Sequence, residues 1–123
     1  MKKFVLDLSE YEIEVLVPDT DSEGHEMKEV MQVYPLRDNI NVWLRSIGIF
    51  QNAEDIAEAV CLAKRIRDCK DDSIELDDRE ADVLKQAINR IVKLTHDGMV
   101  SPGLGGEVHE EAIIRIVKMK EVK

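Results

Sequence analysis

The feature that most constrains this fold is a change of hydrophobic period around Pro35. Before Pro35, apolar and polar residues alternate with a period of two, which is typical of strands with one solvated face. After it, apolar residues recur at helical spacing, at Ile40, Trp43, Leu44 and Ile47. Proline cannot donate a ladder hydrogen bond and biases the preceding residue towards an extended conformation. The chain therefore divides into a strand-forming part at about 3–34 and a helical part at about 38–120.

Two alternating segments, at about 10–17 and 27–34, predict an antiparallel β-hairpin. The residues that separate them, Pro18 to Gly24, are rich in turn formers. An earlier alternation at Phe4, Leu6 and Leu8 can supply a third strand of the same sheet.

Helix start and stop signals divide the helical part. Asp38 or Asn39 can cap a short first helix, which Gly48 ends. Asn52, followed by Asp55, begins a second helix that runs to about residue 69.

A third and longest helix follows Asp77 and Glu80, which have capping-box spacing. The glycine-rich residues 98–106 predict a flexible loop, and residues 108–117 return to the helical period. The last residues fray, extend this helix or add an edge strand. At 123 residues, the whole chain, 1–123, is predicted to be one domain. Its class is α+β, with an N-terminal antiparallel β-hairpin or three-stranded sheet packed by three to four α-helices.

The net charge of the chain limits the classes of partner that it can bind. Lys and Arg number 17 against 26 Asp and Glu, which gives −9 and opposes attraction to nucleic-acid phosphates and anionic membranes. No apolar run approaches a membrane span, and charge interrupts the residues after Lys2 and Lys3. We expect a cytoplasmic protein without direct nucleic-acid or membrane binding, whose acidity serves solubility or forms a functional acidic face.

The two cysteines are not expected to be linked. On one helix, Cys61 and Cys69 would lie about 12 Å apart, beyond the reach of a disulfide. We expect Cys61 in the core and Cys69 as an exposed thiol at the helix end.

Motifs for catalysis or metal binding are incomplete. The stretch that begins at His109 lacks a second histidine where a zincin motif needs one, because Ile113 stands there. His25 and His96 lie in other segments and give no local nucleophile and base. The glycine-rich loop lacks the Gly-Lys-Ser/Thr sequence that ends a P-loop, so a connecting loop is favoured over a phosphate-binding site. We predict no enzyme activity, no catalytic residue, no metal and no cofactor.

Five residues are candidates for binding, because Trp, Tyr and Arg most often anchor interfaces. They are Tyr34, Arg37, Trp43, Arg45 and Arg115. The alternative is that Trp43 fills the core while the arginines cover its edge. Arg115 is flanked by isoleucine and valine, which favours a packed stem with its head in an ion pair or an anion contact.

Segments along the chain follow one order: an N-terminal strand pair, a Tyr-Pro-basic segment before a Leu-rich helix, a helix with small residues, an acidic Leu-Glu turn and helix, and a final Arg-containing apolar segment. The residues that carry this pattern are Tyr34 to Arg37, Ile40, Leu44, Ile56-Ala57, Ala63 to Ile66, Ile74 to Leu76, Glu80, Leu84, Ala87, Ile113 to Arg115 and Glu121-Val122. In this pattern the chain resembles a family of small phage and prophage proteins of unassigned function. The chain departs from it at Leu44-Arg45-Ser46, where the family has Leu-Phe, and in its longer glycine-rich loop.

The resemblance implies a non-enzymatic accessory protein in the bacterial host cytosol. One hypothesis makes it an assembly or interaction factor that self-associates into a homo-oligomer and binds a protein partner, through an open hairpin edge and apolar helix faces. The other makes it a counter-defence protein. It would sequester a small anionic nucleotide signal where Arg37, Arg45 and Arg115 converge, or mask a host protein with the acidic stripe of Glu10, Glu12 and Glu14.

Overall fold

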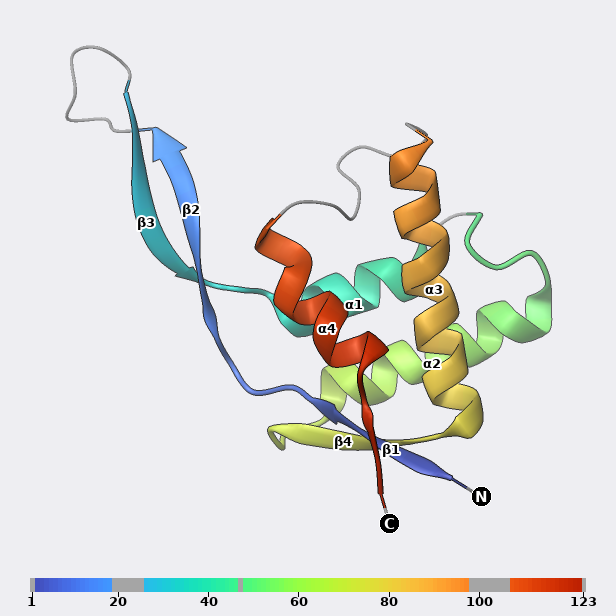
Figure 1. The fold of residues 1–123 in the computed structure, drawn as a ribbon. Helices are drawn as coiled ribbons and strands as arrows, with labels where there is room; N and C mark the ends of the chain where they lie inside the picture. The colour runs from blue at the N-terminus through green and yellow to red at the C-terminus, as the bar shows by residue number, and fades with distance from the viewer. Residues whose placement is uncertain (1, 19–25, 47, 98–106, 123) are drawn as a thin grey trace.

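The computed structural model describes residues 2–18, 26–46, 48–97 and 107–122. In chain order its elements are β1 (Lys3–Asp7), β2 (Glu12–Pro18), β3 (Met27–Val33), α1 (Leu36–Arg45), α2 (Ala53–Asp68), β4 (Ser73–Asp77), α3 (Asp78–His96), the 3-10 helix η1 (Glu107–His109), α4 (Glu110–Val117) and β5 (Lys120–Glu121). The helices and one small sheet form a body, from which β2 and β3 project (Figure 1).

The small sheet has β1 in its centre, in the order β4-β1-β5. Both pairings are antiparallel, with Leu6 opposite Ile74 and Phe4 opposite Glu121. Leu6 is completely buried, so the sheet turns one face to the helices. Because β1 and β5 are neighbours, the two ends of the described chain lie close together (Figure 1).

The second sheet is the hairpin of β2 and β3, which we call the arm. Its register runs from Glu12 opposite Val33 to Pro18 opposite Met27. Tyr34 N–H donates to the Tyr11 carbonyl at 3.0 Å and extends the ladder by one pair at the root of the arm. Residues 11 and 34 therefore form the root of the arm.

Local signals explain the helix starts. The Asn52 side chain accepts from the Asp55 N–H at 2.9 Å, which caps α2. Asp77 and Glu80 form the predicted capping box of α3, because each side chain accepts from the other residue's backbone N–H. The buried faces of the helices and small sheet share one core, which includes Leu6, Ile40, Leu62, Leu84, Ile88 and Ile116.

The α+β prediction is confirmed. The three-stranded sheet, however, is not an extension of the hairpin, because β1 pairs with β4 and β5. Residues 73–77, which the family resemblance placed in an acidic turn before a helix, form β4. Of the three predicted fates of the last residues, the edge strand is the one observed, at β5.

The predicted start of α1 was wrong, because the N-cap is Pro35 and not Asp38 or Asn39, three or four residues later. The helix begins at Leu36, directly after Pro35, so Asp38 lies in its first turn. Pro35 suits this position because a helix start needs no N–H partner there. At the other end α1 stops at Arg45, and Gly48 lies beyond it with a φ of 85°.

The predicted environments of the cysteines were also wrong. Cys61 is exposed, whereas Cys69 is partly buried. Ala59, Leu62, Ala63 and Ile66 form the buried face of α2, and Cys61 lies off that face. Cys69 is the C-cap residue of α2, and its thiol lies 3.6 Å from the Ser73 carbonyl oxygen.

Two predicted segments, the hairpin turn and the glycine-rich loop, lie largely outside the described residues. In the described ranges, none of the helices combines the length and apolar character that a bilayer span requires.

We expect Leu6→Ala to lower the free energy of unfolding by about 2–5 kcal/mol, because it leaves a cavity beneath the central strand. Leu16→Ala is the matched control, since Leu16 is 62% exposed and Leu6 is 0% exposed. The control should change stability by less than about 0.5 kcal/mol. Urea denaturation of both variants measures the difference. Equal losses would contradict the assignment of Leu6 to the core.

Candidate functional site

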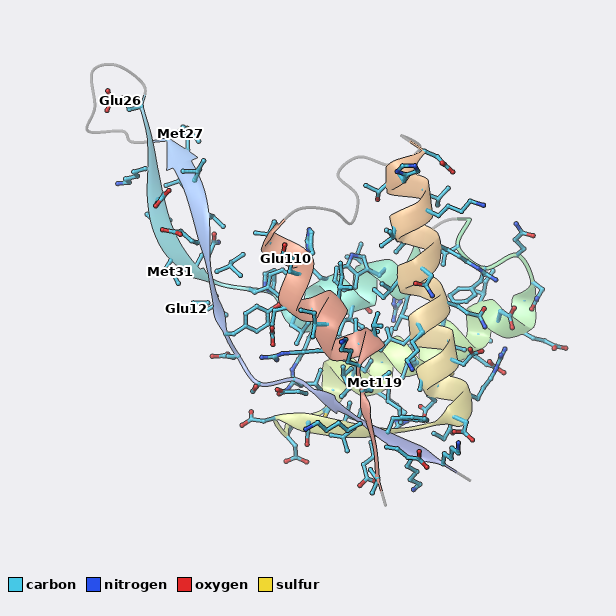
Figure 2. The ribbon with its side chains drawn as sticks, in the orientation of Figure 1. Glu12, Glu26, Met27, Met31, Glu110 and Met119 are labelled. Carbon is cyan, nitrogen blue, oxygen red and sulfur yellow. The ribbon has the colours of Figure 1, made fainter. Side chains whose placement is uncertain are left out.

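The arm carries a concentration of exposed apolar side chains. Four of the ten large hydrophobic residues that are exposed within the described ranges belong to it: Leu16 at 62%, Met31 at 59%, Met27 at 54% and Val33 at 49%. Figure 2 shows Met27 and Met31 on the arm, clear of the helices. Exposed apolar residues that gather on one element, rather than lying scattered, are typical of an interaction surface.

The register explains why these four gather. Residues directly opposite each other in an antiparallel pair point to the same side of the sheet. Leu16 is opposite Glu29, Met31 is opposite Glu14, and both pairs share a face with Met27 and Val33. This outer face is exposed along the strands, whereas Ile13, Val15, Val17 and Val30 on the other face are half-buried. The outer face thus places carboxylates opposite apolar side chains, with Glu12, Glu14 and Glu29 facing Val33, Met31 and Leu16 across the two strands.

Aromatic rings hold the root of the arm on the body. Tyr11 and Tyr34 stack with ring centroids 5.1 Å apart. The His109 ring meets the rings of Tyr34 and Trp43 edge-on, at 5.7 and 5.9 Å. A hydrogen bond of 2.7 Å also joins the Tyr34 hydroxyl to His109 Nδ1. These four residues, which we call the junction cluster, connect the arm to α1 and to the start of α4.

Burial shifts the titration of the junction cluster. It raises the pKa of Tyr11 to about 12, with a further contribution from Tyr34. It also raises the pKa of Tyr34 and lowers the pKa of His109. All three shifts favour the neutral form, as desolvation requires. The cluster is therefore an uncharged contact near neutral pH.

Arg115 supports the same root from α4. Its guanidinium lies 4.5 Å from the centre of the Tyr11 ring and donates to the Ser9 carbonyl at 2.8 Å. It also forms ion pairs with Glu111 at 2.9 Å and Asp7 at 3.6 Å. The side chain is only 11% exposed. Arg115 thus clamps the segment between β1 and β2 to the body.

Arg37 has a comparable role at another contact. Its guanidinium donates to the carbonyls of Cys69 and Asp71, the latter at 2.8 Å. A longer bond reaches the Ile66 carbonyl at 3.4 Å. These carbonyls lie at and beyond the C-terminal end of α2, where the last helical carbonyls need partners. Arg37 therefore ties α1 to the end of α2.

The five predicted binding residues lie in three places. Tyr34 and Trp43 are buried in the junction cluster, with 3% and 7% exposure. Arg37 and Arg115 both lie near Ser9. Arg37 and Ser9 line the same surface hollow, and Arg115 donates to the Ser9 carbonyl. Arg45 is exposed at the opposite end of α1. Arg45 follows Arg37 by eight positions of helix, which is a rise of about 12 Å.

Sequence reasoning missed Tyr11 and His109 as parts of this contact. Tyr11 appeared only as one apolar member of an alternating strand, and His109 only as part of a failed zinc motif. Their proximity comes from packing between segments almost a hundred residues apart, so no local pattern signals it. The aromatic character of Tyr11 at the foot of the predicted strand was the available hint.

A cavity of about 610 Å³ lies between the connection of α1 to α2 and the end of α3. Its charged lining residues are Asp55, Arg90, Lys93 and Asp97, so the charges balance. Arg90 also donates to the Ile49 carbonyl and lies over the Phe50 ring at 5.2 Å. The lining therefore favours neither an anion nor a cation. Across the described residues, no three His, Cys, Asp or Glu side chains are placed to hold a metal ion.

Comparisons with family models, curated proteins and solved structures found no match for this chain.

We expect Arg115→Met to lower the free energy of unfolding by about 1–3 kcal/mol, because it removes hydrogen bonds to the Ser9 and Asp7 carbonyls. Arg45→Met is the matched control at an exposed helix end, with an expected change below about 0.5 kcal/mol. Chemical denaturation followed by circular dichroism gives both values. If the two variants were equally stable, Arg115 would not be a clamp.

His109 should make stability depend on pH. Its folded pKa lies below the ordinary value of 6.5, so the unfolded chain binds a proton more readily. This contribution to stability is present above pH 6.5 and is lost as the pH falls from there through the folded pKa. We expect urea denaturation at a series of pH values to show a smaller loss for His109→Phe than for the wild type. His96→Phe, at the exposed end of α3, should behave like the wild type, and an unchanged slope in His109→Phe would disprove the assignment.

Proposed function

We propose that this protein is a non-enzymatic interaction factor that contacts a protein partner through the arm. The observation that carries the proposal is the gathering of Leu16, Met27, Met31 and Val33 on one outer face of a projecting hairpin. A two-stranded hairpin is marginally stable alone, so apolar residues on its outer face gain most when a partner covers them. The arm's root is fixed by the junction cluster, which presents the face in one direction.

The chemistry of the arm describes the partner surface. Methionine side chains adapt to irregular apolar surfaces, which suits Met27 and Met31 to a shallow apolar groove. Glu12, Glu14 and Glu29 share the face and favour basic residues around that groove. Masking of a basic host-protein surface, one form of the counter-defence hypothesis, uses the same face.

Sequestration of an anionic nucleotide has less support. Binding a phosphate requires guanidinium donors that are available to the ligand. Arg37 and Arg115 direct theirs at backbone carbonyls, and Arg45 lies about 12 Å from Arg37 along α1. We therefore favour the protein-binding role. The phage or prophage origin that the sequence resemblance implies stays a prediction, which the genes that flank this one would test.

The proposal can be tested by placing a photo-crosslinking amino acid at Leu16 or Met31 in bacteria that express the protein. Ile56, an apolar residue of α2 that is 48% exposed, is the matched control on the body. We expect protein adducts from the arm positions and few from position 56. The adduct partner would then be purified and its affinity measured.

Met31→Glu should weaken the binding of that partner at least about tenfold, because it places a charge in the apolar contact. Ile56→Glu should leave the affinity within about twofold. The absence of adducts from every arm position would contradict the proposed function. Any turnover that His109→Ala abolishes would contradict its non-enzymatic part.

A further inference from the structure

The two edges of the arm differ in their capacity to accept another strand. Tyr34 N–H donates to the Tyr11 carbonyl, and the pairs that exchange hydrogen bonds alternate along an antiparallel ladder. Val30 and Gln32 therefore direct their backbone groups at β2. The outer edge of β3 presents the N–H and C=O groups of Met27, Glu29, Met31 and Val33. Within the described residues the arm is a sheet of two strands, so no third strand covers this edge.

The opposite edge, on β2, is protected. The same alternation directs the backbone groups of Glu12, Glu14, Leu16 and Pro18 outwards. Pro18 has no N–H to donate, and the two carboxylates repel another acidic strand. By contrast, β3 contains one Lys and one Glu, which sum to zero, and no proline. Its edge is the one that can accept a strand.

We infer that the partner of the β3 edge is a second copy of the chain, an inference that rests on the proposed function. The β3 strands of the two copies pair antiparallel about a two-fold axis at Val30. In that register Met27 is opposite Val33, Lys28 is opposite Gln32 and Glu29 is opposite Met31. No like charges face each other, and all seven residues of the strand are paired. The contact is self-complementary, as a two-fold interface requires.

Neighbouring registers are less favourable. An axis at Glu29 places the two Glu29 carboxylates directly opposite each other, which is destabilising. An axis at Met31 leaves Met27 opposite Pro35, which lies beyond the strand and has no N–H. The axis at Val30 also joins the outer faces of both arms into one four-stranded sheet, the size at which such sheets become stable.

The first test is sedimentation of the purified full chain over a concentration series that reaches the millimolar range. The wild type should form a dimer. Met31→Pro removes an outward N–H without removing a bond within the arm, and it should weaken the dimer at least about tenfold. Leu16→Pro makes the same change on β2, at a side chain that is 62% exposed against 59% for Met31, and should leave the dimer intact. Circular dichroism checks that both variants are folded.

The second test fixes the register and does not depend on proline. In a background of Cys61→Ser and Cys69→Ser, Val30→Cys should form an intermolecular disulfide under mild oxidation. The two Val30 Cα atoms would be about 4.5 Å apart, as in a pair that does not exchange hydrogen bonds. Gln32→Cys lies on the same side of the same strand and should not link, because its copies would be about 13 Å apart.

The outcomes separate the two proposals. A dimer that Met31→Pro weakens, together with linkage at position 30 but not 32, supports the inference. A monomer at every concentration, a dimer that survives Met31→Pro, or equal linkage at both positions overturns it. If arm adducts form only with other proteins, the inference fails while the proposed function stands. If the arm gives no adducts at all, the proposed function fails as well.

Discussion

The position of the arm depends on how the segment between β1 and β2 satisfies its backbone. This segment leaves one sheet and enters another, so its carbonyls have no continuous ladder to join. Arg115 donates to the Asp7 and Ser9 carbonyls, and Leu8 N–H donates to the Asp72 carbonyl at 2.7 Å. Buried backbone groups without partners are costly, so these bonds restrict the path of the chain. The arm leaves the body where that path ends.

The junction cluster adds the second constraint, on the returning strand. Tyr34 follows β3 directly, stacks on Tyr11 and contacts His109, and the Trp43 ring also meets the His109 ring edge-on. The contact therefore joins residues from the beginning, middle and end of the chain. Its rings carry no charge near neutral pH, and the guanidinium of the neighbouring Arg115 lies over the Tyr11 ring. A packed root and an exposed outer face are compatible because separate residues provide them.

Local signals in the sequence were sufficient for most of the fold. The alternation before Tyr34 predicted the hairpin, and the capping residues Asn52 and Asp77 placed two helix starts. The pairing of β1 could not be predicted, since its partners lie some seventy and more than a hundred residues away. The strand β4 was hidden because its two apolar residues, Ile74 and Leu76, lie among acidic residues that also suit a turn.

The candidate site was predictable only in part, for the same reason. Tyr34 and Trp43 were recognised as residues suited to contacts, yet their burial depends on His109, which approaches from the far end of the sequence. The arginines could be identified as candidates, whereas the carbonyls that occupy Arg37 and Arg115 belong to other elements. The alternation of apolar and polar residues in β2 and β3 predicts that one face of the arm is exposed, but it does not predict the separation of the arm from the body. That separation is a property of the packed molecule.

The pairing of β1 with β5 has a practical consequence for work on this protein. It brings both ends of the described chain to the side of the body away from the tip of the arm (Figure 1). Ends that lie close together on a surface tolerate fusion and circular permutation well. Fluorescent labels or carrier domains attached at either end should therefore leave the arm accessible. The molecule could be displayed on a carrier with its arm directed outwards.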